Sequence, residues 1–174
     1  MLRYIAILLS VLFPARLVLA ATGSAAIPAA VSAYAKGMAE SCREVGGKPG
    51  TSPHLAQSGD LNGDGIADWV IDEGGFDCEG AASLFSGSGG AQVVVFLGDP
   101  GGKAHKAFDH GAFGMHMEHK GSGAVLWLAV AGQLCGQKHQ QSRADAIACE
   151  RPLAWDGRKH RLGFAPVSQA RPVH

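Results

Sequence analysis

Apolar residues recur at helical spacing in the first part of the chain that follows the N-terminal segment. The stretch "IPAAVSAYAKGMAESC" has an apolar position every three or four residues, at Ile27, Val31, Tyr34, Met38 and Cys42. This spacing places the five side chains on one face of a helix. Pro28 suits the first turn, and "VGGKPG" after Arg43 ends the pattern. We therefore predict one helix that packs through this face.

Beyond this helix the apolar pattern changes to alternation and short runs. Strands are predicted for "DWVIDE" from residue 68, "AQVVVFLGD" from residue 91, "GMHMEH" from residue 114 and "AVLWLAVAG" from residue 124. The Asp156-Gly157 pair in "LAWDGRKHRLGF" predicts a hairpin turn with positive φ. We expect five or six short strands in all. The predicted fold is α+β and mainly β, with one N-terminal helix packed on a small antiparallel sheet or sandwich.

The N-terminus has the pattern of a secretory signal peptide. A basic start at Arg3 is followed by an apolar stretch and by small residues around Ala20. A membrane anchor is the alternative, but Pro14 and Arg16 interrupt the roughly 20 apolar residues that a span needs. We expect cleavage after residues 1–20, no transmembrane segment in the mature chain, and export to the periplasm or the extracellular space. Residues 21–174 are then a single disulfide-bonded domain.

The chain has four cysteines: Cys42, Cys78, Cys135 and Cys149. An even number in an exported chain favours disulfides over free thiols. The absence of a CxxC pair argues against a zinc ribbon or a thioredoxin-like site. Three connectivities are possible. We favour Cys42–Cys78 with Cys135–Cys149, because this choice pairs neighbours along the chain around Gly-rich or polar loops.

Charge is nearly balanced overall but unevenly distributed. Without Arg3 and Arg16, the 15 basic residues fall to 13 against 15 acidic ones, which excludes nucleic acid as a partner of the whole chain. Residues 49–102 contain eight carboxylates and no Lys or Arg, whereas the chain from Lys103 has ten basic and five acidic residues. A bound cation would relieve repulsion within this acidic block.

The acidic block contains an oxygen-rich loop, "GDLNGDGIADWVIDEG", at residues 59–74. Side-chain oxygens occur at positions 1, 3, 5 and 9 of a D-x-N-x-D-G-x-x-D pattern, and the carbonyl at position 7 is also available. Calcium binds six to eight oxygens, and a glycine at position 6 permits the sharp bend. We therefore predict a Ca2+ site formed by Asp60, Asn62, Asp64, Asp68 and the Ile66 carbonyl. The alternative is an Asx-rich turn that binds nothing.

Position 12 of this loop is Ile71 instead of the bidentate Glu of an EF-hand. The segment "DLNGDGIADWVID" resembles the calcium loops of FG-GAP or integrin-type propeller repeats, and this resemblance implies the same ligands. A single copy cannot form the several blades of a propeller. The wider order of motifs is similar to a group of small exported bacterial proteins in which "LFSGSGGA" often carries two further cysteines. This chain has Ser86 and Ala91 where those proteins have the two cysteines.

Other candidate chemistry is weaker. Histidines and methionines, which are copper ligands, crowd between residues 105 and 119: His105, His110, Met115, His116, Met117 and His119. Strand alternation sends Met115 and His116 to opposite faces, which favours inward methionines and a polar outer face. The "FSGSGG" segment fits neither a nucleophile elbow nor a phosphate loop and indicates a flexible turn. Trp69, Trp127 and Trp155 are expected in core or half-buried strand positions.

The sequence favours an exported, non-catalytic binding or structural module that one calcium ion stabilises and that binds a protein or glycan partner. A small periplasmic hydrolase is the first alternative. It needs a concave pocket that joins the acidic block to His110 or His116 as acid and base. A copper-binding protein is the second alternative, and it requires Met115, His116, Met117 and His119 to converge.

Overall fold

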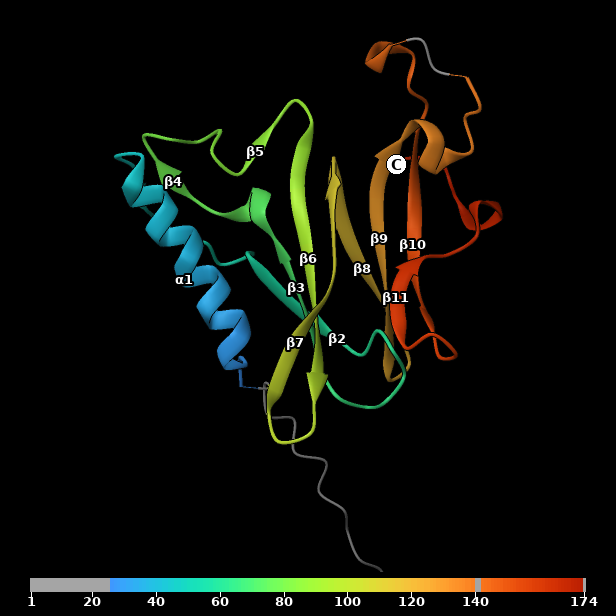
Figure 1. The fold of residues 1–174 in the computed structure, drawn as a ribbon, viewed down its shortest axis with the longest axis horizontal. Helices are drawn as coiled ribbons and strands as arrows, with labels where there is room; N and C mark the ends of the chain where they lie inside the picture. Colours follow the sequence, from blue (N-terminus) through green and yellow to red (C-terminus); the bar gives the residue numbers. More distant parts are fainter. Residues whose placement is uncertain (1–25, 140–141, 174) are drawn as a thin grey trace, which may run out of the picture.

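The computed structural model describes residues 26–139 and 142–173, so the predicted signal peptide lies outside the described residues. The described chain forms one α-helix and eleven strands (Figure 1). A mainly β structure with one N-terminal helix is confirmed, but eleven strands exceed the five or six that we expected. Within the described ranges, no helix has the length and apolar character needed to cross a bilayer.

Helix α1 (Ala29–Glu44) buries the predicted face through Val31, Met38 and Cys42. Pro28 occupies the N-cap with an extended backbone, and Gly46 follows the helix with φ of 82°. A left-handed residue just after a helix is the usual signal for its end. Ile27 precedes the helix and is 55% exposed, so the buried stripe begins at Val31 instead.

All strand pairs are antiparallel, and they form three sheets. The smallest joins β1 (Lys48–Pro49) to β4 (Cys78–Glu79). A five-stranded sheet contains β2 (Ala56–Gly59), β3 (Asp68–Asp72), β5 (Ser86–Gly87), β6 (Gly90–Asp99) and β7 (Lys103–Ala112). A four-stranded sheet contains β8 (Gly114–Lys120), β9 (Gly123–Ala131), β10 (Ala148–Asp156) and β11 (Arg161–Phe164).

The strands that sequence analysis missed are very short or mostly polar. Strands β1, β4 and β5 have two residues each, which is too few to establish a period. Strand β7 has no apolar alternation, because it carries Lys103, His105, Lys106 and Asp109. Among the described strands it pairs with β6 alone, and the pairing has a bulge between Val95 and Phe96. Charges and a bulge protect such an edge from pairing with another chain.

Two clusters contain most of the buried apolar side chains. The inter-sheet core joins the five-stranded sheet to the four-stranded sheet through Val70, Val93, Val95, Leu126, Leu128 and Val130. The second cluster joins α1 to the other face of the five-stranded sheet through Val31, Met38, Trp69, Ile71, Val94 and Phe96. The two faces of β6 therefore serve different clusters, which explains its continuous "VVVF" run. Figure 1 shows α1 on the left and the four-stranded sheet on the right.

Strands β10 and β11 form the predicted hairpin, but the prediction of a tight turn at Asp156-Gly157 was wrong. Asp156 pairs with Arg161, so four residues lie in the loop between them. Positive φ occurs at His160, with a value of 47°. The Asp156 carboxylate accepts the N–H groups of Arg158 at 3.1 Å and Lys159 at 3.2 Å. This Asx-type capping stabilises a longer loop than the sequence motif indicates.

Both favoured disulfides are confirmed. Cys42–Cys78 connects α1 to β4, and Cys135–Cys149 connects the 3₁₀ turn Gly132–Cys135 to β10. Gly47 allows the first bridge to pack, because a Cβ there would lie 2.5 Å from the Cys78 Sγ atom. Bridges that close loops of this size stabilise a fold by about 2–4 kcal/mol each.

Candidate functional site

The candidate calcium ligands lie in the Asp loop, which we define as residues 60–68, from the end of β2 to the first residue of β3. The Asp60 carboxylate accepts the N–H of Gly63 at 2.6 Å and that of Gly65 at 2.9 Å. Both glycines have φ near 80°, at 81° and 80°, which favours glycine over other residues. The loop is therefore folded around the Asp60 carboxylate.

Asn62 and Asp64 form the exposed part of the loop. The Asp64 carboxylate accepts the Ile66 N–H at 2.7 Å and the Asn62 side-chain amide at 3.0 Å. An ionised carboxylate has about four acceptor sites, so these hydrogen bonds leave capacity for a cation. In residues 26–139 and 142–173, no group of three or more His, Cys, Asp or Glu side chains gathers closely enough to hold a metal by itself.

Asp68 is fully buried and ties the Asp loop to the five-stranded sheet. Its two oxygens accept the N–H of Leu61 at 2.7 Å and the N–H of Gly98 in β6 at 2.8 Å. Burial raises the pKa of Asp68, although these two amide bonds oppose the shift. A Cβ on Gly98 would lie 2.4 Å from the Ala67 carbonyl, so only glycine allows β6 to approach the loop this closely.

The Asp loop also contacts the four-stranded sheet. The Ala124 N–H at the start of β9 donates to the Asp60 carbonyl at 2.7 Å, and Leu61 packs against the inter-sheet core. Just before the loop, a Cβ on Gly59 would lie 2.7 Å from both the Ala124 Cβ and the Met117 Sδ. The loop therefore lies where the two large sheets meet, and its order depends on how they are aligned.

The four candidate copper ligands do not converge. Met115 and Met117 pack against the inter-sheet core, as strand alternation predicts. His116 lies on the opposite face, where its ring stacks on Trp127 across β8 and β9 with a centroid distance of 6.3 Å. His116 is therefore separated from the two methionines, and the four side chains do not share one face of β8.

A charged cluster around Arg171 was not found by sequence analysis. The guanidinium contacts Glu118 at 2.7 Å and Glu150 at 2.8 Å, donates to the His116 ring at 2.7 Å, and lies 3.7 Å from the Trp127 ring centroid. Its hydrogen bond is the main reason that the pKa of Glu118 lies below its usual value. The cluster fastens the C-terminal segment to the outer face of the four-stranded sheet. Its members are too far apart in the chain to form a sequence motif.

The acid–base pair that a hydrolase would need is not assembled at His110. A hollow of about 310 Å³ lies at one end of the two large sheets, and its lining includes His110, Phe113 and Leu134 but no carboxylate. The His110 Nδ1 atom donates to the neighbouring Gly111 carbonyl at 2.7 Å. Asp109 contacts Lys106 at 2.5 Å instead of His110.

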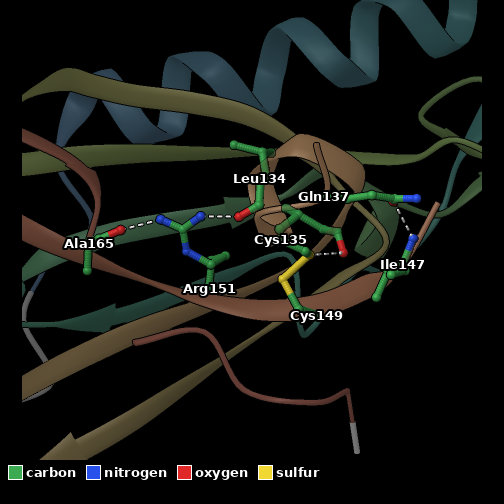
Figure 2. Close-up of a disulfide and its surroundings, with 8 residues drawn as sticks. Leu134, Cys135, Gln137, Ile147, Cys149, Arg151 and Ala165 are labelled. Atoms are coloured by element: carbon green, nitrogen blue, oxygen red, sulfur yellow. Dashed lines mark hydrogen bonds between the residues drawn. A yellow bond between two sulfur atoms is a disulfide. The ribbon is translucent and has the colours of Figure 1, made fainter. Parts of the chain in front are cut away.

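Arg151 is 4% exposed and holds the turn beside this hollow. Figure 2 shows its guanidinium between two carbonyls, those of Leu134 and Ala165, next to the Cys135–Cys149 bridge. Burial lowers the pKa of this guanidinium, which lies 5.4 Å from the Phe164 ring centroid. This role of Arg151 could not be predicted from the sequence, because both acceptors are main-chain atoms.

Because comparison with known proteins found no match, a functional assignment depends on the residues described above. The expected core or half-buried strand positions of the tryptophans are confirmed, since Trp69 is 6% exposed and the other two are partly buried. The chain matches no family model, no curated protein and no solved structure.

Proposed function

We propose that this protein is an exported, non-catalytic binding or structural module that one calcium ion stabilises at the Asp loop. The observation that carries the proposal is the position of the loop between the two large sheets. It is hydrogen-bonded to β6 through Asp68 and to β9 through the Asp60 carbonyl. An ion held there would stabilise the loop and the alignment of both sheets together.

The electrostatics of the loop favour a bound cation. Asp60 and Asp64 carry carboxylates within a segment that has no Lys or Arg, and Asp68 adds a buried carboxylate. The ligands would be Asp60, Asn62, Asp64, Asp68 and the Ile66 carbonyl, which are the hard oxygen donors that calcium prefers. An ion that binds only the folded state stabilises it by about 2.7 kcal/mol at a free concentration of 100 times Kd.

Architecture and cysteine chemistry support the rest of the proposal. We propose that the two large sheets form a sandwich with α1 on its outer face, since each pair of layers shares an apolar cluster. Two disulfides fit an oxidising compartment such as the periplasm or the extracellular space. A partner would be a protein or a glycan bound by a preformed, rigid surface.

Calcium-dependent thermal melting of the oxidised chain without residues 1–20 tests this proposal. We expect calcium to raise the melting temperature by several degrees, because each 1 kcal/mol shifts it by about 2–4 °C in a chain of this size. Asp64→Ala should abolish the calcium-dependent rise. Glu44→Ala, which removes an exposed carboxylate from α1, should retain it. A wild-type melting temperature that calcium leaves unchanged would refute the calcium site.

A further inference from the structure

The antiparallel topology brings four connections to one end of the molecule. These are the Asp loop, the β6–β7 turn, the β8–β9 turn and the β10–β11 turn. Gly98 near the end of β6 bonds to the Asp loop, and Ala124 at the start of β9 bonds to it as well. Strand β10 runs antiparallel to β9, so β10 ends where β9 begins. Figure 1 shows these connections toward the lower side of the molecule.

Three of these connections carry exposed basic residues: Lys103, Lys120, Arg158, Lys159 and Arg161. The densest group is the basic tip, which we define as residues 157–161 of the β10–β11 hairpin. It presents Arg158, Lys159, His160 and Arg161 at four consecutive exposed positions. Lys159 forms an ion pair with Asp156 at 3.6 Å, and both groups are exposed. Such a pair is too weak to neutralise the tip.

The basic tip is a preformed structure with a hollow beside it. Asp156 accepts two main-chain N–H groups from the tip, and these amides hold the pKa of Asp156 below its usual value against the opposing effect of desolvation. The hollow, of about 610 Å³, is lined by Trp155, Asp156, Gly157, Arg158 and Lys159. Trp155 packs against the inter-sheet core, so its indole is a fixed wall of the hollow.

We propose that the basic tip docks on the anionic lipid headgroups of a membrane surface, with a headgroup phosphate entering the hollow beside Trp155. A surface of anionic lipids attracts Lys and Arg side chains that lie within a Debye length of it. Guanidinium and ammonium groups bind phosphate oxygens, and indole rings favour the headgroup level of a bilayer. The partner is a plane of headgroups and not a nucleic-acid or glycan strand, because residues 157–161 include no Phe, Tyr or Trp on which bases or sugars could stack.

The Asp loop lies at the same end and affects the strength of this docking. Asp60 and Asp64 lie at this end of the molecule, so their carboxylates would oppose the attraction of the basic residues to an anionic surface. A calcium ion in the loop would remove this repulsion, so the two proposals are linked through charge. Docking by the basic tip does not require the ion, however, and it goes beyond the function proposed above.

Co-sedimentation with lipid vesicles tests the inference. The oxidised chain is mixed at low salt with EGTA and with vesicles of phosphatidylcholine, with or without phosphatidylglycerol. We expect sedimentation with the anionic vesicles only, and a loss when salt shortens the Debye length below about 8 Å. The double variant Arg158→Glu/Lys159→Glu should bind at least tenfold more weakly, because reversing two charges costs more than 1.4 kcal/mol.

The matched control reverses two exposed basic residues at the opposite end, with Arg43→Glu/Lys48→Glu. Its binding should equal that of the wild type, and thermal melting should show that both double variants are folded. Equal binding to neutral vesicles, no binding to any vesicle, or equal losses in both double variants would each overturn the proposal. Binding to soluble dextran sulfate without binding to anionic vesicles would also overturn it, because the partner would then be a polyanion chain.

Repeating the co-sedimentation with calcium in place of EGTA distinguishes the membrane proposal from the calcium proposal. If calcium strengthens vesicle binding by the wild type but leaves binding by Asp64→Ala unchanged, both proposals are supported. Binding in EGTA that depends on the basic tip but does not respond to calcium supports the membrane inference and counts against the calcium loop. Calcium-dependent melting without vesicle binding supports the loop and refutes membrane docking.

Discussion

Arg151 is the clearest case of one residue holding distant segments together. Its guanidinium bonds the Leu134 carbonyl in the 3₁₀ turn and the Ala165 carbonyl after β11. Arg151→Met keeps most of the side-chain volume but leaves both carbonyls without this donor. Relief of the buried charge offsets part of the loss, so we expect a net decrease of about 1–3 kcal/mol in the free energy of unfolding. Urea denaturation measures it.

Arg161→Met is the matched control for that variant. Arg161 is exposed on β11, and surface substitutions of this kind usually change stability by less than about 0.5 kcal/mol. Equal urea midpoints for Arg151→Met and Arg161→Met would show that the two carbonyls find water instead, and that Arg151 does not hold the turn.

The stability that the Arg171 cluster contributes is expected to depend on pH through Glu118. The hydrogen bond from Arg171 is the largest cause of its lowered pKa, which desolvation opposes. A carboxylate with a lowered folded-state pKa contributes stability above its unfolded value of about 4.3, and this stability is lost as pH falls through the folded value. Melting temperatures of wild type and Glu118→Gln should therefore converge below about pH 4 and differ at neutral pH. Parallel pH curves would exclude the predicted linkage.

Residue-level prediction succeeded where local chemistry decides the outcome. Strand alternation correctly placed Met115 inward and His116 outward, and the number and context of the cysteines led to the correct bridges. Arg151 and Arg171 were missed because their partners come from remote segments. Only the folded chain brings a guanidinium to a carbonyl 14 or 17 residues away, and no residue type marks such an acceptor.

At the level of elements, the Cys135–Cys149 bridge and Arg151 hold the same turn. Without the bridge, chain entropy alone predicts a loss of about 3 kcal/mol for a loop of this length. In the variant Cys135→Ser/Cys149→Ser, the turn that carries Leu134 is freed, so Arg151 loses one acceptor as well. We expect a loss above the entropic value, measured by urea denaturation of the oxidised wild type and the variant.

A double-mutant cycle shows whether the bridge and Arg151 act together. Adding Arg151→Met to the bridge variant should cost less than it costs in the wild type, because part of its interaction is already gone. Strict additivity would mean that the turn stays in place without its disulfide. The same cycle with Arg161→Met should be additive.

The elements that were predicted correctly from the sequence are those with a regular pattern of buried positions. Helix α1 and strands β3, β6, β8 and β9 bury a regular face or both faces, so their patterns were readable. Strand β7 was missed because it is a polar edge, and the β10–β11 turn was misjudged because the Asp156 side chain caps a longer loop. Local capping and edge position depend on neighbours that a single segment does not reveal.

At the scale of the whole molecule, the uneven charge along the chain was visible in the sequence, but its spatial meaning was not. The acidic block led to the Asp loop as a candidate cation site. The basic residues from Lys103 onward could not be linked to the acidic block from the sequence. The strand directions place three turns that carry basic residues beside the Asp loop. Topology therefore connects two sequence features that periodicity treats separately.

Stabilisation of the whole molecule by calcium is expected to depend on pH. Burial raises the pKa of Asp68, so this group contributes stability that is fully present below its unfolded value of about 3.9 and is lost as pH rises through the folded value. Calcium binds the ionised carboxylates, so it competes with protons and offsets this loss. The calcium-dependent rise in melting temperature should therefore be small near pH 4 and increase toward pH 7. A rise of equal size at all pH values would show that the ion binds away from Asp68 and the loop carboxylates, whatever its effect on stability.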